Sequence, residues 1–219
     1  MKPKAILKMV IDVIMTILML FLMAYHITGR QAHEVMGIIL FCLFMVHHIL
    51  NINWYKSLRK GKYSISRILN TAVNILLSIV MACMIASGLM LSVLGLAAVG
   101  RPLHMISTYW GFLLISIHLG LHWGMVMGMA KRISKNKSSS KSGLVISRLL
   151  VGIISLRGIY AFFSRRMWEK LFLVVEFSFF DFDAPIWVFF LDYIAIMGLF
   201  ACIAYYSIKG LRKKPLRIE

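Results

Sequence analysis

Long apolar segments dominate this chain and restrict what it can fold into. Several approach or exceed 18 residues, about the length at which an α-helix can cross the hydrocarbon core of a membrane. With 60% hydrophobic residues and a mean hydropathy of +0.83, the chain has more apolar side chains than a soluble domain of 219 residues can bury. The sequence therefore predicts an all-α, polytopic transmembrane helical bundle.

Six membrane helices are expected. Their approximate bounds are 5–25, 33–50, 68–94, 103–130, 144–163 and 186–207. Segment 167–180 is amphipathic enough to lie on the outer surface, and the FFDFDAP stretch is expected to form a short acidic turn. The predicted domains are a four-helix haem-binding core over 1–130, a basic linker over 131–143, and a two-helix membrane hairpin with an interfacial segment over 144–219.

The basic residues predict the topology. The formal charge of +17 comes from lysines and arginines in short segments between the apolar runs, and such segments stay in the cytoplasm. Loops 51–67 and 131–143 and both termini are therefore expected inside, so the second and fourth helices run inward. The first helix is expected to be a retained signal anchor. This distribution points to anionic membrane lipid as the partner of the positive charge, and nucleic acid is not expected.

All seven histidines lie in or at the ends of three predicted helices. Ionisable side chains at membrane depth are costly and usually functional. His104 and His118 are 14 residues apart, which is about 21 Å along a helix and about 40° short of four full turns, so they face nearly the same way at two depths. His33 and His47 repeat this spacing in the second helix.

The repeated spacing predicts two haem sites. Because both helices are expected to run inward, His33 matches the depth of His104, and His47 matches the depth of His118. Imidazole is an axial ligand of haem iron, and helical bundles build such sites from facing helices. These four histidines are the predicted axial ligands of two b haems. No C-x-x-C-H motif is present, so a covalently attached c-type haem is not expected.

Two further histidines leave the inner ligands open. His122 shares a face with His104 and lies one turn beyond His118, so it is an alternative inner ligand, opposite His48 instead of His47. A third haem is the less favoured count, because the number of histidines does not fix the number of cofactors.

The outer site also has alternatives. His26 could replace His33 or hydrogen-bond a ligand imidazole. Arg30 and Arg101, and less clearly Arg157, are placed to pair with propionates of an outer haem, and contact with lipid headgroups is an equal alternative.

Asp12, Asn70 and Asn74 are further polar residues inside apolar helices. For Asp12 the favoured interpretation is a hydrogen-bonded contact with a nearby lysine or arginine. Asn70 and Asn74 are four residues apart on one helix face, and contacts between packed helices are the default interpretation for both.

A different function class is also possible for the histidines. A metal-ion or proton-coupled transporter would use them to bind a divalent cation. Such a site should place carboxylates beside the histidines, and only Glu34 is so placed in the sequence. A purely structural membrane subunit would not explain seven histidines in and beside membrane helices. An electron-transfer cytochrome is therefore the favoured hypothesis.

Four stretches carry a resemblance to a known family. They are ILKMVIDVIMTILMLFLMAYHITG, HEVMGIILFCLFMVHHILNINWY, RPLHMISTYWGFLLISIHLGLHWG and FFDFDAP. In combination they resemble the flavinylation-associated cytochromes, which are small bacterial membrane proteins. The resemblance covers most of the chain and implies a haem b protein that passes electrons from the membrane to extracytosolic proteins carrying covalently attached flavin. Quinol or another membrane donor is the expected source of electrons, and quinol oxidation is the one enzymatic activity that this hypothesis includes.

Overall fold

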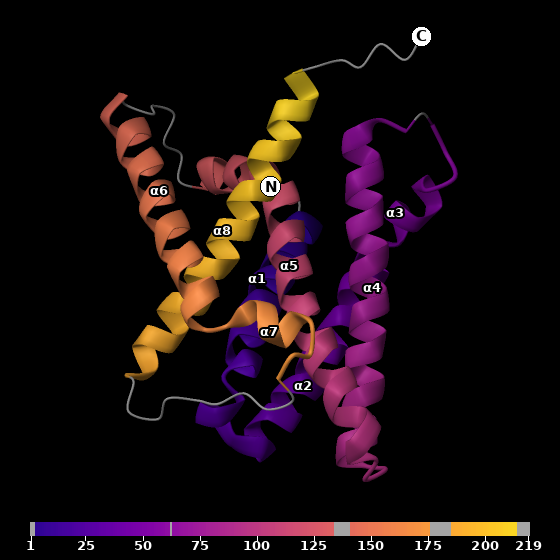
Figure 1. Cartoon of the computed structure of the whole chain (residues 1–219). Coiled ribbons are helices and arrows are strands. Elements are labelled where there is room, and N and C mark those ends of the chain that lie inside the picture. The colour runs from indigo at the N-terminus through magenta and orange to yellow at the C-terminus, as the bar shows by residue number, and fades with distance from the viewer. Residues whose placement is uncertain (1–2, 62, 134–140, 176–184, 214–219) are drawn as a thin grey trace. The chain divides into compact units, whose positions relative to one another are not determined.

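The computed structural model describes residues 3–61, 63–133, 141–175 and 185–213. In these residues the chain forms eight α-helices and no β-strand (Figure 1). The helices are α1 (Pro3–Met23), α2 (Tyr25–Leu50), α3 (Ile52–Ser57), α4 (Ile65–Ser92), α5 (Ala97–Ile133), α6 (Lys141–Ser164), α7 (Met167–Leu171) and α8 (Ile186–Lys213). Six of them, α1, α2, α4, α5, α6 and α8, are long and apolar enough to cross a membrane. The predicted all-α membrane bundle is confirmed, and the chain is a multi-pass membrane protein.

The described helices form two compact units. The first holds α1, α2, α3 and the first turn of α8, and the second holds α4 to α7 and the rest of α8. The predicted four-helix core over 1–130 takes helices from both units and stays a prediction.

The first unit depends on a break at Gly29. The amides of Ile27 and Thr28 still bond the Ala24 carbonyl, at 2.9 and 3.0 Å, so helical structure continues past the end of α1. Gly29 then has a φ of 76°, a backbone conformation that residues with a side chain rarely adopt. The interval expected between the first two helices is thus almost entirely helical, and only Gly29 departs from helical geometry.

The second unit is built on the α4–α5 hairpin. Ser64 caps α4 by accepting a hydrogen bond from the Arg67 amide at 3.3 Å, so the helix begins three residues before the predicted start. α5 begins at Ala97 and contains Pro102, which was expected to precede it. Pro102 is the sixth residue of α5, beyond the first amides that have no intrahelical partner, and the helix continues past it.

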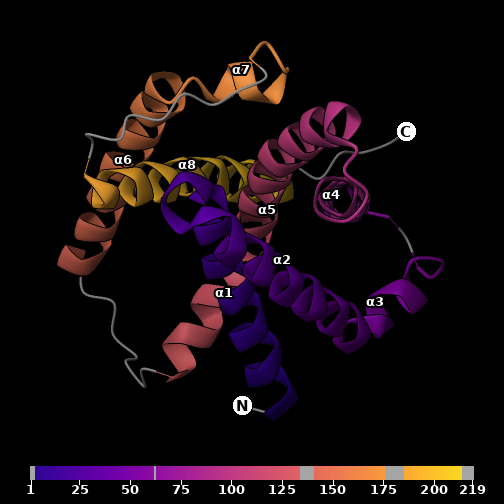
Figure 2. The same ribbon diagram turned by 90° about the horizontal axis from the view of Figure 1, so that it is seen from below.

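Small residues let α8 approach its neighbours closely. A Cβ built on Gly120 of α5 would lie 2.7 Å from the Ala201 Cα, and one on Gly158 of α6 would lie 2.8 Å from the Leu199 Cβ. No side chain fits at such distances, so both crossings require glycine. The crossing of α6 and α8 is visible in both views (Figures 1 and 2).

Asp192 of α8 holds two arginines of this unit, a contact that the sequence analysis did not predict. Its side chain is 3% exposed and accepts hydrogen bonds from Arg157 of α6 at 2.5 Å and from Arg165 at 2.9 Å. Arg157, which lies within an apolar helix, is therefore held by a carboxylate of the same unit. Two cations and one anion share this site, and removing the anion would leave both cations uncompensated.

The segment after α6 packs against α5. Within the described residues it contains α7, and Met167, Glu169, Lys170 and Leu171 of this helix are buried. The Trp110 indole of α5 donates a hydrogen bond of 2.9 Å to the Leu171 carbonyl. One face of α7 is therefore covered by α5, and the location of this segment at the outer membrane surface stays a prediction. Residues 179–184 of the FFDFDAP stretch lie outside the described residues.

We expect Asp192→Ala to lower the free energy of unfolding by about 3 kcal/mol, because it strands two partly buried arginines. The matched control is Glu34→Ala. Glu34 pairs with Arg30 at 2.8 Å, but the two side chains are 42% and 70% exposed, so the control should cost less than about 1 kcal/mol. Denaturant unfolding in detergent measures both. Equal losses in the two variants would show that the Asp192 cluster has no special stabilising role.

Candidate functional site

His104 of α5 is oriented by a serine of α4. Its Nδ1 lies 3.1 Å from the Ser87 Oγ, and the fully buried Ser87 hydroxyl donates its own proton to the Met84 carbonyl at 2.9 Å. Because that hydroxyl proton is already used, Ser87 accepts a hydrogen bond from the His104 Nδ1–H. The imidazole is therefore the tautomer that carries its lone pair on Nε2.

His118 is held in the same manner one layer further along α5. Its Nδ1 lies 2.8 Å from the Asn74 Oδ1. An amide oxygen can only accept, so the His118 Nδ1–H donates and the lone pair again lies on Nε2. Histidines that bind metals characteristically donate their second ring N–H to such a neighbour, which fixes the tautomer and the ring orientation.

The two acceptors repeat the spacing of the histidines. Asn74 and Ser87 are 13 residues apart on α4, and His104 and His118 are 14 residues apart on the antiparallel α5. The hairpin therefore presents two imidazoles at two levels, each with a buried or half-buried partner. Sequence reasoning took Asn74 for a packing residue and assigned Ser87 no part in the site. The matched spacing is the signal that could have identified both.

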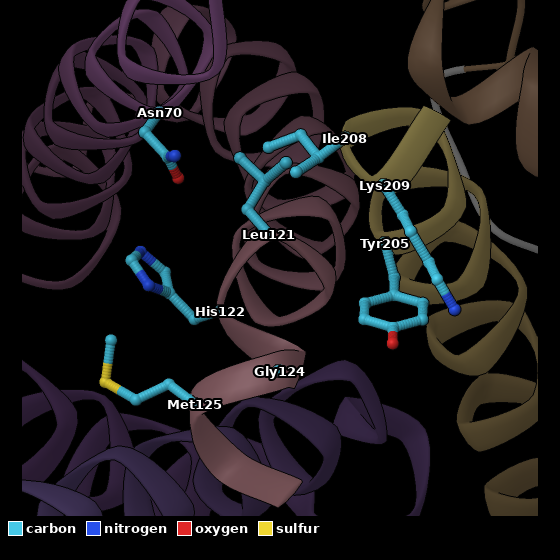
Figure 3. Close-up of a pocket in the computed structure, with 8 residues that line it drawn as sticks. All are labelled: Asn70, Leu121, His122, Gly124, Met125, Tyr205, Ile208 and Lys209. Carbon is cyan, nitrogen blue, oxygen red and sulfur yellow. The ribbon is translucent and has the colours of Figure 1, made fainter. Parts of the chain in front are cut away.

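His122 lies beside a cavity. Its ring centroid is 4.6 Å from that of His118, with a tilt of 55° between the rings. The cavity has a volume of about 600 Å³ (Figure 3). Its lining residues are Asn70, Leu121, His122, Gly124, Met125, Tyr205, Ile208 and Lys209. His122, the alternative inner ligand, is thus in contact with the favoured one.

In the first unit, His47 lies in a chain of hydrogen bonds. Its Nδ1–H donates to the Asp12 Oδ1 at 2.7 Å, and its Nε2 lies 3.4 Å from the Asn51 Nδ2. The Asn51 Oδ1 in turn accepts from the Lys8 Nζ at 2.7 Å. The expected lysine or arginine partner of Asp12 was wrong, because the carboxylate bonds a histidine.

His48 differs from His47 in the hydrogen bonding of its ring nitrogens. Its Nδ1 and the Tyr55 hydroxyl form a hydrogen bond, and its buried Nε2 has no hydrogen-bond partner among the described residues. Partial burial raises the pKa of the Tyr55 phenol above its ordinary value, so Tyr55 stays protonated at neutral pH. A buried ring nitrogen in this state is suited to a metal bond.

The remaining predicted residues lie near the α1–α2 turn or at the start of α5. The His33 ring makes an edge contact with Tyr25 at 5.1 Å, and the His26 ring makes one with Phe189 at 4.8 Å. Arg30 pairs with Glu34, the acid that the transporter hypothesis placed beside the histidines.

Arg101 is exposed near the start of α5. A propionate-binding role for Arg30 and Arg101 stays a prediction. The predicted pairing of His33 with His104, and of His47 with His118, takes one histidine from each unit and also stays a prediction.

In the described part of the chain, no group of three or more His, Cys, Asp or Glu residues is arranged to hold a metal ion. A haem iron in a bundle needs two axial side chains, one from each of two helices. Comparisons with protein-family models, with curated proteins and with solved structures find no match to this chain. The functional argument therefore depends on the geometry of its own residues.

Lys170 of α7 is a buried cation of the second unit. Its side chain is 7% exposed, and its Nζ lies 5.3 Å from the centroid of the Tyr109 ring. Burial, with a smaller contribution from repulsion by Arg165, lowers the pKa of Lys170 to about 8, and Glu169 opposes the shift. The ammonium form is thus held in a place that disfavours its charge.

This shift predicts a pH dependence of stability. Between about pH 8 and pH 10.5 the unfolded chain binds a proton at Lys170 that the folded protein has lost. The free energy of unfolding should therefore rise with pH across this window, by up to about 3 kcal/mol. Denaturant unfolding from pH 7 to pH 10.5 measures the rise. Lys170→Met should lack it, and an identical rise in this variant would exclude Lys170 as its source.

Proposed function

We propose that this protein is a b-type cytochrome that carries electrons across the cytoplasmic membrane of a bacterium, with both termini in the cytoplasm. The observation that carries the proposal is the α4–α5 hairpin. His104 and His118 are presented at two levels, and each is fixed by an α4 acceptor in the tautomer whose Nε2 can coordinate iron. Basic loops on one side and few charges on the other support the orientation.

Two haems with two imidazoles each are the proposed cofactors. From α5, His104 would hold the outer iron and His118 the inner one. From α2, His33 would complete the outer site. For the inner site, the hydrogen bonds favour His48 over His47, because both ring nitrogens of His47 already contact other side chains while the buried Nε2 of His48 has no partner among the described residues.

A bound haem b supplies a ferric/ferrous couple that accepts and donates one electron. The chain's own residues would set the properties of that couple. Ser87 and Asn74 accept hydrogen bonds from the ligand imidazoles, which raises the basicity of these ligands and holds the rings in place. The apolar helices around them exclude water and lower the local dielectric constant.

Quinol is the proposed donor, and an extracytosolic protein carrying covalently attached flavin is the proposed acceptor. The support for the acceptor is the resemblance of the four stretches quoted above to flavinylation-associated cytochromes. The support for a membrane donor is the location of the histidines in and beside helices of membrane-spanning length.

A haem count tests the proposal. The purified protein, produced with adequate haem supply, should show reduced b-type absorption bands and about two haems per chain by the pyridine haemochrome method. His104→Ala and His118→Ala should each remove about one haem, because each deletes one axial ligand. Thr108→Val, one turn from His104 on the same helix, is the matched control and should keep both. A colourless protein would contradict the proposal and favour a histidine-lined transporter.

The hydrogen bond to Asn74 should affect haem binding without being part of the ligand set. Asn74→Leu should weaken haem binding at one site about 10- to 100-fold, because it releases the orientation of His118. Ser78→Ala, one turn along α4, is the control. Haem titration of the apoprotein measures both affinities. Equal affinities in the two variants would contradict the role of Asn74 in positioning His118.

A further inference from the structure

The cavity beside His122 combines an apolar wall with a few convergent polar groups. Leu121, Met125 and Ile208 supply apolar lining from α5 and α8. Asn70 and His122 point toward one another on one side of α5, while Tyr205 and Lys209 lie on its other side, beside α8 (Figure 3). A volume of about 600 Å³ is in the range of small-molecule sites.

Asn70 determines what kind of group the cavity accepts. Its Nδ2 donates to the Ser66 carbonyl at 2.8 Å, while its buried Oδ1 has no hydrogen-bond partner among the described residues. A buried acceptor of this kind needs a donor, and the missing donor costs free energy. The occupant should therefore present a hydroxyl or N–H at this point. A lipid phosphodiester offers only acceptor oxygens there and is disfavoured.

The position of the cavity further restricts the occupant. It lies among three helices of membrane-spanning length, so its occupant should be soluble in the membrane. The His122 ring contacts that of His118, which is the inner iron ligand of the proposed function. A flat apolar ring with hydroxyl donors fits the lining, the acceptor and this location together.

We infer that this cavity binds a membrane-soluble hydroquinone, with Asn70 and His122 accepting hydrogen bonds from its hydroxyl groups. The inference deepens the proposed function, on which it rests, by locating the site of its donor. It also separates the two neighbouring histidines, because His118 is assigned to iron and His122 to the hydroquinone.

Two glycines of α5 give a matched test of the site. A Cβ at Gly124 and a Cβ at Gly128 both meet nothing within 4 Å, so the first atom of a side chain is accommodated equally at the two positions. Only Gly124 lines the cavity. Gly124→Leu should therefore fill part of the binding space, and Gly128→Leu should leave it unchanged.

The experiment measures menadiol binding by anaerobic calorimetry to the full-length, pre-reduced protein in phosphatidylcholine nanodiscs. Gly124→Leu should weaken binding at least about tenfold, and Gly128→Leu should bind within about twofold of the wild type. Asn70→Leu should weaken binding about tenfold, because it removes the acceptor. If Gly124→Leu fails to fold, the Asn70→Leu variant alone tests whether menadiol binds in this cavity.

The inference is overturned if the wild type does not bind menadiol, or if the folded cavity variants bind it as tightly as Gly128→Leu. Gly124-sensitive binding of phosphatidylglycerol in place of menadiol would also overturn it. The haem content of each sample separates the two claims. A haem-free protein with Gly124-sensitive menadiol binding contradicts only the cytochrome proposal. A haem-loaded protein without such binding contradicts only the hydroquinone site.

Discussion

The hydrogen bonds between the α5 imidazoles and the α4 side chains organise the candidate site. Water is scarce inside a membrane, so a buried imidazole N–H needs a protein acceptor. Ser87 and Asn74 provide one at each level, which fixes both the ring orientation and the position of the proton. The close packing of the hairpin helps to make these contacts possible, since a Cβ on Gly111 would already lie 3.1 Å from the Met84 Cε.

The same requirement explains the other polar residues of the bundle. Asp192 pairs with two arginines whose charge is costly in an apolar environment. Asp12 accepts a hydrogen bond from the His47 Nδ1–H. Polar atoms left over after such pairing are informative, because each one needs a partner from outside the described contacts. The Nε2 of His48 and the Oδ1 of Asn70 are two such atoms, and they support the iron and hydroquinone proposals respectively.

The sequence predicted the six long helices because apolar runs of membrane length have few alternatives. Helix ends were less predictable, since the Ser64 cap and the tolerance of Pro102 depend on local geometry. Periodicity along single helices pointed to the histidines. Their partners could not be predicted in this way, because Ser87 with His104 is a contact between helices, made by residues distant in the chain. The burial of α7 depends on packing against α5, and no pattern in the sequence predicted it.

Electron paramagnetic resonance of the oxidised full-length protein tests the central claim most directly. Two imidazoles per iron predict low-spin ferric haem, with one of two signals lost in His104→Ala and the other in His118→Ala. Both signals should remain in Thr108→Val. A high-spin spectrum from the wild type, or the loss of neither signal in the two histidine variants, would contradict the assignment of these residues as axial ligands.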